Sequence, residues 1–418
     1  MSDKTTEFSR ARKMQLSYGI PHSILLLALI QVFFPSCHQF SCHGFSTRAT
    51  ASSTPGGIQT SSNNNINNIL ILDHINMNHG KGRHDWLKSF YGTDFLGCAW
   101  DPRKAKNLET GCKTLWANLG AQQFHLPEGS PNAQVLDGVI TIVHPSPETL
   151  LERYASIQDD ASCLYSNDSL FHVVVEDRDS DADNGADADT VLIVTDPWGS
   201  VFRIVKEGDR DPRGSQPGEV SEGSAISDLT IHVPMDANLE GIGRFYEKIL
   251  GAKLATPTTV DDDETVQNIQ IEMGPFQTLT FLPKESVGVD THVDLREMED
   301  DNDNDDDDDA TMSSGTSTTL ENYGVHISLY VADLPTSYQK AHDLGLAYVN
   351  TRFSRRAYNL EEAVNDCMFR CLDIVDPLNP QDGPILRLEH EVRSVVKKDG
   401  SKYKSCPFET IPDVCVTV

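Results

Sequence analysis

One pattern of strands and helices occurs four times along the chain, and it limits the folds that are open to it. Each repeat begins with a short run of alternating apolar and polar residues, which predicts a half-buried β-strand. A polar turn and an amphipathic helix follow, and three further strand-like runs close the repeat. We therefore expect an α+β fold made of four βαβββ modules. The opening strands begin at Leu72, Gly138, Asp228 and Val325.

The four units are of two alternating kinds. In the first and third, the helix ends in Phe-Tyr and a Leu-Gly follows, within 90–97 and 245–251. The second and fourth share an Asp-Pro turn before their last strand, at Asp196 and Asp376. This alternation indicates that a pair of units was duplicated, so each neighbouring pair is expected to form one domain. The expected divisions are a first domain at 69–215, a second domain at 216–395 and a C-terminal tail at 396–418.

The charge of the chain is strongly acidic, with 63 Asp and Glu against 34 Lys and Arg and a formal net charge of −29. Binding to nucleic acid is not expected, because few basic side chains are available to neutralise phosphates. Most of the excess lies in short stretches that interrupt the repeats. We expect an acidic loop at 176–189 in the first domain and a disordered acidic insert at 286–320 in the second.

The N-terminal segment, 1–68, is expected to be a targeting segment with a disordered linker. Its apolar run at 24–34 has the length of a signal-peptide core and is too short to span a bilayer comfortably. The tract that follows is poor in acidic residues and includes Phe45, and it resembles the transit peptide of algae with secondary plastids. A plastid location is favoured, with the secretory pathway or an N-terminal membrane anchor as alternatives. No stable membrane span is expected in the mature protein.

The βαβββ order, the Phe-Tyr helix ends and two short motifs together resemble the vicinal-oxygen-chelate (VOC) superfamily. The motifs are the turn Asp196-Pro197-Trp198-Gly199 and a strand His-Ile-Ser-Leu-Tyr-Val that begins at His326. The superfamily includes glyoxalases, fosfomycin-resistance proteins and extradiol dioxygenases, and the resemblance covers 70–395. It implies two open-barrel domains, in each of which two modules face each other around a cupped interior. A ferredoxin-like array is the alternative, but it does not account for the repeated helix ends and turns.

The resemblance also implies where a metal ion would bind. In the superfamily, inward residues of the first and last strands of each unit hold a divalent metal (Fe, Mn, Ni or Zn) and leave positions open for two adjacent substrate oxygens. In the first expected domain these positions carry His74 and His125, followed by Val139 and Arg203. Valine and arginine do not ligate metals, so two ligands remain there. The alternative interpretation is that both histidines are hydrogen-bonded residues of the core.

In the second expected domain the corresponding positions carry Asp228, Phe281, His326 and Glu389. Three of these can ligate, so the resemblance implies Asp228, His326 and Glu389 as the metal ligands. Successive strand residues face opposite sides, so Glu391 is expected to face inward with Glu389. His390 is then expected to face solvent or the neighbouring domain. Arginines on the same strands, Arg203 and Arg387, are candidates for binding the substrate.

Two kinds of function are compatible with these residues. The first is a divalent-metal-dependent enzyme of lyase, isomerase or dioxygenase type that acts on a small substrate with vicinal oxygens. The second is a metal-free protein that binds or sequesters a small molecule and carries degenerate metal sites, as Val139 and Phe281 indicate. In both cases the partner is a small-molecule ligand. The units are expected to pair within one chain, as a monomer or a homodimer.

Overall fold

The structure is a computed structural model, and it describes most of the chain after residue 66. Its described residues are 67–110, 114–129, 133–159, 162–176, 190–206, 213–255, 268–285, 297–298, 320–321, 325–351 and 355–416. The expected targeting segment, except for its last two residues, and nearly all of both acidic stretches lie outside these ranges, so the targeting and disorder predictions remain predictions. None of the helices in the described part of the chain has the length and apolar character needed to cross a bilayer.

The predicted repeat is present, and each unit opens with a strand and a helix. The first unit contains β1 (Ile69–Asn76), α1 (His84–Tyr91), β3 (Ala99–Trp100), β4 (Leu115–Leu119) and β5 (Gln122–Leu126). The second contains β7 (Gly138–Val143), α3 (Pro147–Asp159), β8 (His172–Val175), β9 (Leu192–Thr195) and β10 (Val201–Val205).

The later two units differ from this order locally: among the described residues, the third has two closing strands after its helix where three were expected, and the fourth has an additional helix between its closing strands. The third contains β11 (Ala225–Pro234), α4 (Leu239–Phe245), which a π-helical turn, Tyr246–Leu250, extends, β12 (Ile269–Glu272) and β13 (Thr278–Lys284). The fourth contains β16 (His326–Val331), α5 (Leu334–Asp343), β17 (Ala347–Tyr348), α6 (Leu360–Asp366), β18 (Met368–Val375) and β19 (Pro384–Ser394). Short elements lie within the first unit, β2 (His79–Gly80) and α2 (Asn107–Thr110), and between units, β6 (Glu128–Gly129), β14 (Glu297–Met298) and β15 (Leu320–Glu321).

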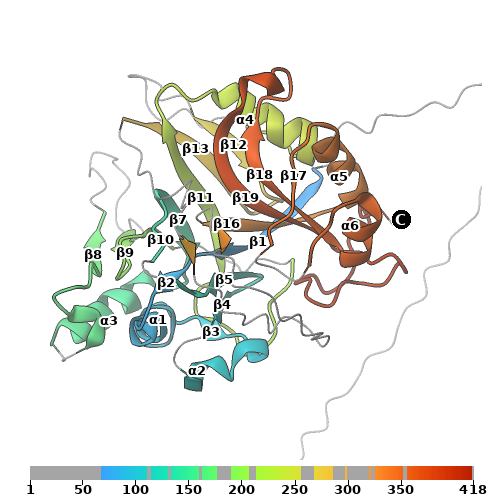
Figure 1. The fold of residues 1–418 in the computed structure, drawn as a ribbon. Coiled ribbons are helices and arrows are strands. Elements are labelled where there is room, and N and C mark those ends of the chain that lie inside the picture. The colour runs from blue at the N-terminus through green and yellow to red at the C-terminus, as the bar shows by residue number, and fades with distance from the viewer. Residues whose placement is uncertain are drawn as a thin grey trace, which may run out of the picture. The chain divides into compact units, whose positions relative to one another are not determined.

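The units form two open mixed sheets, and this confirms the predicted α+β class (Figure 1). One sheet has eight strands in the order β17-β18-β19-β16-β1-β5-β4-β3, and the other has seven in the order β12-β13-β11-β7-β10-β9-β8. In both, the opening strands of two units pair antiparallel at the centre, β1 with β16 and β7 with β11. Within each unit, the opening strand pairs parallel with the closing strand.

The pairing of the units differs from the expected division into neighbours. The eight-stranded sheet joins the first unit to the fourth, and the seven-stranded sheet joins the second to the third. The expected boundary between 215 and 216 therefore falls in the connection from β10 to β11, two strands of one sheet. Every opening strand needs a partner along its free edge, and all four strands have the same alternation, so their sequences do not specify which edges meet.

The expected C-terminal tail packs onto the eight-stranded sheet. Its side chains Tyr403 and Phe408 are buried in a small apolar cluster with Tyr330 of β16. The amide of Val416 donates a hydrogen bond to the carbonyl oxygen of Ala332, at 2.9 Å. The tail therefore forms part of the core at one end of this sheet.

Candidate metal centre

The inner face of the eight-stranded sheet carries charged side chains that are buried. Along β19, Leu388, His390 and Val392 alternate with Glu389 and Glu391. The two glutamates share one face of the strand, as the period of two predicts, and both are at most 4% exposed. Buried carboxylates require partners or bound cations, so this face is the first place to look for a functional site.

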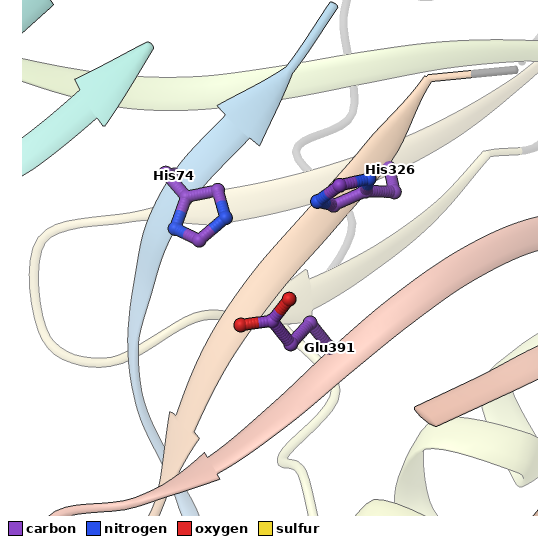
Figure 2. A group of neighbouring side chains, drawn as sticks. All are labelled: His74, His326 and Glu391. Carbon is purple, nitrogen blue, oxygen red and sulfur yellow. The ribbon is translucent and has the colours of Figure 1, made fainter. Parts of the chain in front are cut away.

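Three residues of this face come close enough to share one ion. Ligand atoms of His74, His326 and Glu391 lie within 4.8 Å of one another, and in the described ranges no other three His, Cys, Asp or Glu side chains are grouped in this way. They project toward a common space from β1, β16 and β19, as Figure 2 shows. The group therefore combines one ligand of the first unit with two of the fourth.

His74 has the environment of a metal ligand. Its Nδ1 is 2.9 Å from Oδ2 of the buried Asp73, and its Nε2 is buried without a hydrogen-bond partner. A register shift between Leu72 and His74 places both Asp73 and His74 in the interior. Burial lowers the pKa of His74, although Asp73 acts in the opposite direction. The imidazole is therefore neutral at pH 7, with one nitrogen oriented by a carboxylate, as is usual for metal-binding histidines.

His125 lies beside this group rather than in it. Its ring stacks on His74 with centroids 3.7 Å apart and on Trp116 with centroids 4.3 Å apart. Its Nε2 is 3.2 Å from Oε1 of Gln123, so one ring nitrogen already has a partner. Burial, and then the charge of His74, hold the pKa of His125 well below its usual value. The His125 ring is therefore neutral and lines one side of the site.

Two arginines contact the carboxylates, Arg370, which is buried, and Arg393, which is half-buried. Arg370 binds Glu391 through Nη2 and Glu389 through Nη1, the latter at 2.6 Å from Oε1. Arg393 also binds Glu391, and Nδ2 of Asn350 donates to Glu389 at 3.0 Å. Burial raises the pKa of Glu391, but the charges of Arg370 and Arg393 outweigh this effect and hold it well below its usual value. Glu391 is therefore ionised, as a ligand must be.

The donor set fits a divalent transition metal. Two imidazoles and one carboxylate form the arrangement that leaves several coordination positions open, which is known from non-haem iron enzymes. The unpartnered Nε2 of His74 is the observation of this structure that a metal ion would explain. Glu391 carries hydrogen bonds from both arginines, yet two oxygens offer about four lone-pair positions, so it can bind an ion as well.

The predicted trio of Asp228, His326 and Glu389 is not brought together. Asp228 lies on β11 of the seven-stranded sheet, whereas the other two lie on β16 and β19 of the eight-stranded sheet. Three threonine hydroxyls donate hydrogen bonds to its carboxylate, from Thr230, Thr278 and Thr280. The trio assumed that the third and fourth units share one sheet, and they do not.

The two arginines expected to bind substrate lie outside the three-residue group and have acidic partners. Nη2 of Arg203 is 2.9 Å from Oε2 of Glu176, and Nε of Arg387 is 2.9 Å from Oδ1 of Asp373. Both arginine side chains are more than a third exposed. These contacts are surface ion pairs, and substrate binding by either arginine remains a prediction.

His390 is a core residue, so of its two expected surroundings, solvent or the neighbouring domain, solvent is wrong. The residue is 0% exposed, and its Nε2 is 2.7 Å from the hydroxyl of Tyr246. On that face of β19, His390 packs against Phe245 of α4 and Tyr246 of its extension, with ring centroids 5.8 Å and 5.5 Å apart. The strand period specified the face on which His390 lies but not which side chains of the third unit lie against it.

Replacing Tyr246 by phenylalanine should lower the free energy of unfolding by about 1–3 kcal/mol, because it leaves a buried imidazole nitrogen without a partner. Denaturant unfolding of the full chain measures this change. The control is Tyr165→Phe, where the side chain is exposed and no loss is expected. Equal stability of the Tyr246→Phe variant and the wild type would show that the hydrogen bond is not formed.

Several solved structures are similar to this chain in the path of the backbone. A putative dioxygenase from Bacillus subtilis is 12% identical, with a TM-score of 0.42, and the match covers 79% of this chain and 86% of that one. Glyoxalase I from Zea mays is 12% identical, with a TM-score of 0.41, covering 78% and 92%. A 2,3-dioxygenase from Pseudomonas is 9% identical, with a TM-score of 0.25, covering 81% and 94%.

No family model and no curated protein matches the sequence. The similar structures are glyoxalases and dioxygenases, the kinds of protein that the motifs of this chain resemble. Because their TM-scores lie below 0.5, we argue the function from the side chains of this chain.

Proposed function

We propose that the protein binds one divalent transition-metal ion through His74, His326 and Glu391. We further propose that it is a metal-dependent enzyme acting on a small substrate with two adjacent oxygens. The unpartnered Nε2 of the buried His74, in a group whose ligand atoms lie within 4.8 Å of one another, carries this proposal. When bound, the ion supplies Lewis-acid stabilisation of charge that develops on substrate oxygens. Lyase, isomerase and dioxygenase reactions all use such stabilisation.

The residues around the group have separate tasks in this proposal. Asp73 orients His74, and Arg370 with Arg393 keeps Glu391 ionised. The stacked rings of His125 and Trp116 close one side and exclude water. A water-poor surrounding strengthens electrostatic interactions within the site.

Glu389 is the carboxylate placed to move a proton. It lies opposite His326 in the strand register and accepts hydrogen bonds from Arg370 and Asn350. It is not a member of the group formed by His74, His326 and Glu391. A positioned carboxylate beside a bound substrate acts as a general base. We assign this task to Glu389 and expect Glu389→Gln to retain the metal while losing turnover.

The metal content of the purified full chain tests the proposal. We expect near one Fe, Mn, Ni or Zn per chain by elemental analysis, and near none in His74→Ala or His326→Ala, since each removes a ligand. The matched control is His342→Ala on α5, an exposed histidine that should leave the content unchanged. A metal-free wild type whose melting temperature is unaffected by any of the four added ions would refute the proposal.

A metal-free binding protein is the second candidate, and one observation favours it. Both oxygens of Glu391 already interact with arginines, Arg370 at one and Arg393 at the other. Such pairs partly neutralise a carboxylate and compete with a cation for it. This candidate predicts that the purified chain contains no metal and that His326→Ala and wild type bind small molecules equally well.

A further inference from the structure

Four aromatic rings of the first two units form a second cluster of polar side chains. His79 of β2 lies near His84 of α1, with ring centroids 6.0 Å apart, and near Trp198, with centroids 6.1 Å apart. Trp198 in turn lies 6.0 Å from Trp86 of α1. We call these residues the four-ring cluster; β2 and α1, which carry three of them, are in contact and can be found in Figure 1.

Every ring nitrogen of the four-ring cluster is buried without a hydrogen-bond partner. Both nitrogens of His79 and of His84 are in this state, as are the indole nitrogens of Trp86 and Trp198. The side-chain amide nitrogen of Gln134, whose backbone amide binds the carbonyl of Asn78 beside His79, is a seventh such atom. Buried polar groups are nearly always hydrogen-bonded. Seven unpartnered nitrogens in one region indicate that a polar group binds there.

The chemistry of these atoms indicates what that group is. The indole and amide nitrogens can only donate, so a metal ion would leave three of the seven unpartnered. Burial, and then the charge of His84, together lower the pKa of His79 to about 4. Burial also lowers the pKa of His84. The neutral rings each have one N–H, so donors outnumber acceptors, which favours a group rich in acceptor oxygens.

The surrounding backbone and charges also favour a negative group. His84 is the first residue of α1, and the N-cap residue, Arg83, makes no side-chain hydrogen bond to the first turn. A helix N-terminus attracts negative charge. The guanidinium of Arg83 lies 4.1 Å from the ring centroid of Trp86. A Cβ on Gly80 would lie 2.9 Å from Nε1 of Trp198, so glycine leaves that N–H uncovered.

Other charged groups near the cluster are mixed in sign. Glu128 and Asp85 raise the pKa of His84, while Lys88 lowers it. Backbone carbonyls also approach the rings, that of Pro127 at His79 and that of Asn107 at His84, and both raise the pKa. The carboxylate of Asp196 orients the turn at Trp198, because its Oδ1 accepts hydrogen bonds from the backbone amides of residues 198–200. No acidic side chain therefore supplies the missing acceptor within the described residues.

We propose that the four-ring cluster binds an oxyanion group of a small molecule, a carboxylate or a phosphate. The N–H groups of Trp86, Trp198 and Gln134 donate to its oxygens, and His79 and His84 donate in turn. The site shares no residue with the proposed metal centre, so either proposal can fail without the other.

Intrinsic fluorescence tests this site, because two of the four tryptophans of the chain belong to it. We expect a saturable change when inorganic phosphate or acetate is added to the full chain, and the stronger of the two ions identifies the source of the oxyanion. His79→Gln and Trp198→Phe should each weaken binding at least tenfold. The matched controls are His342→Gln, exposed on α5, and Trp100→Phe on β3, outside the cluster; neither should change the affinity.

The dependence on pH supplies a second measurement. An anion raises the pKa of a neighbouring histidine, so binding takes up a proton, and affinity for acetate should rise as the pH falls from 7.5 to 5.5. The rise is up to about tenfold per pH unit for one proton. Binding should persist in His326→Ala, which separates this site from the metal centre. The proposal is overturned if neither ion gives a saturable change, if the cluster variants bind as wild type does, or if a divalent metal alone binds through His79 and His84.

Discussion

Replacing Arg370 by leucine should lower the free energy of unfolding by about 3–5 kcal/mol, the usual cost of leaving a buried ion pair with one partner. Arg370 is 5% exposed and binds both Glu389 and Glu391. Without it, two carboxylates stay in the interior, and only Arg393 remains near one of them. The change is measured by denaturant unfolding of the full chain at pH 7.

The control for this prediction is Arg387→Leu on the same strand. Arg387 pairs with Asp373, and both side chains are about a third exposed. An exposed pair contributes about 0–1 kcal/mol, so this variant should be nearly as stable as wild type. Similar losses for the two variants would contradict the view that the carboxylates are buried around Arg370.

The pH dependence of stability provides a second test of the same network. Burial raises the pKa of Glu391, but the charges of Arg370 and Arg393 hold it well below its usual value of 4.5. A carboxylate with a depressed folded-state pKa stabilises the fold above its unfolded pKa, and this contribution is lost as the pH falls through the folded pKa. Stability should therefore fall on acidification below about pH 4.5. The fall should be smaller in Arg370→Leu, which has less of this contribution to lose.

Replacing Phe281 by alanine should lower the free energy of unfolding by about 3–5 kcal/mol, the range for large aromatic residues in a core. Its position on β13 corresponds to a ligand position of the resembled superfamily that a phenylalanine cannot fill, and the ring is fully buried in the main apolar core, with its centroid 5.7 Å from that of Tyr246. The loss comes from apolar area returned to water and from the cavity that remains. Thermal and denaturant unfolding both report it.

Phe276→Ala is the matched control in the same unit. Phe276 is 48% exposed, and surface substitutions change stability by about 0.5 kcal/mol or less. If Phe281→Ala were as mild as this control, Phe281 would not be part of the core, and its strand would have a different register.

The candidate site shows which of its features residue patterns can predict and which they cannot. His74 and His326 were both expected as ligands, and the structure brings them into one group. The sequence placed them in different sites because it paired neighbouring units. Glu391 was expected to face inward with Glu389. The predicted trio included Glu389, whereas the group in the structure includes Glu391, two residues further along the same face of β19. The strand period specifies the face of a side chain, whereas the register between strands specifies which residues meet across it.

The arginines beside Glu391 are the part of the site that the sequence did not indicate. Arg370 and Arg393 lie in ordinary strand patterns, and nothing in those patterns distinguishes them from the more exposed Arg387. The distinction depends on which segments cover the sheet. The C-terminal tail packs on it around Tyr330 and Phe408, a contact that the sequence pattern did not indicate.

Local patterns were sufficient for the four repeated modules, their alternating kinds and the inward faces of their strands, but not for every closing strand, because periodicity and turn chemistry act over a few residues. They were not sufficient for the partner of each unit. That choice depends on contacts between residues some 250 apart, such as His74 with Ser328, and four opening strands of the same character compete for it. The metal-binding group of His74, His326 and Glu391 exists only in the pairing that the folded chain adopts, since its ligands come from the first and last units.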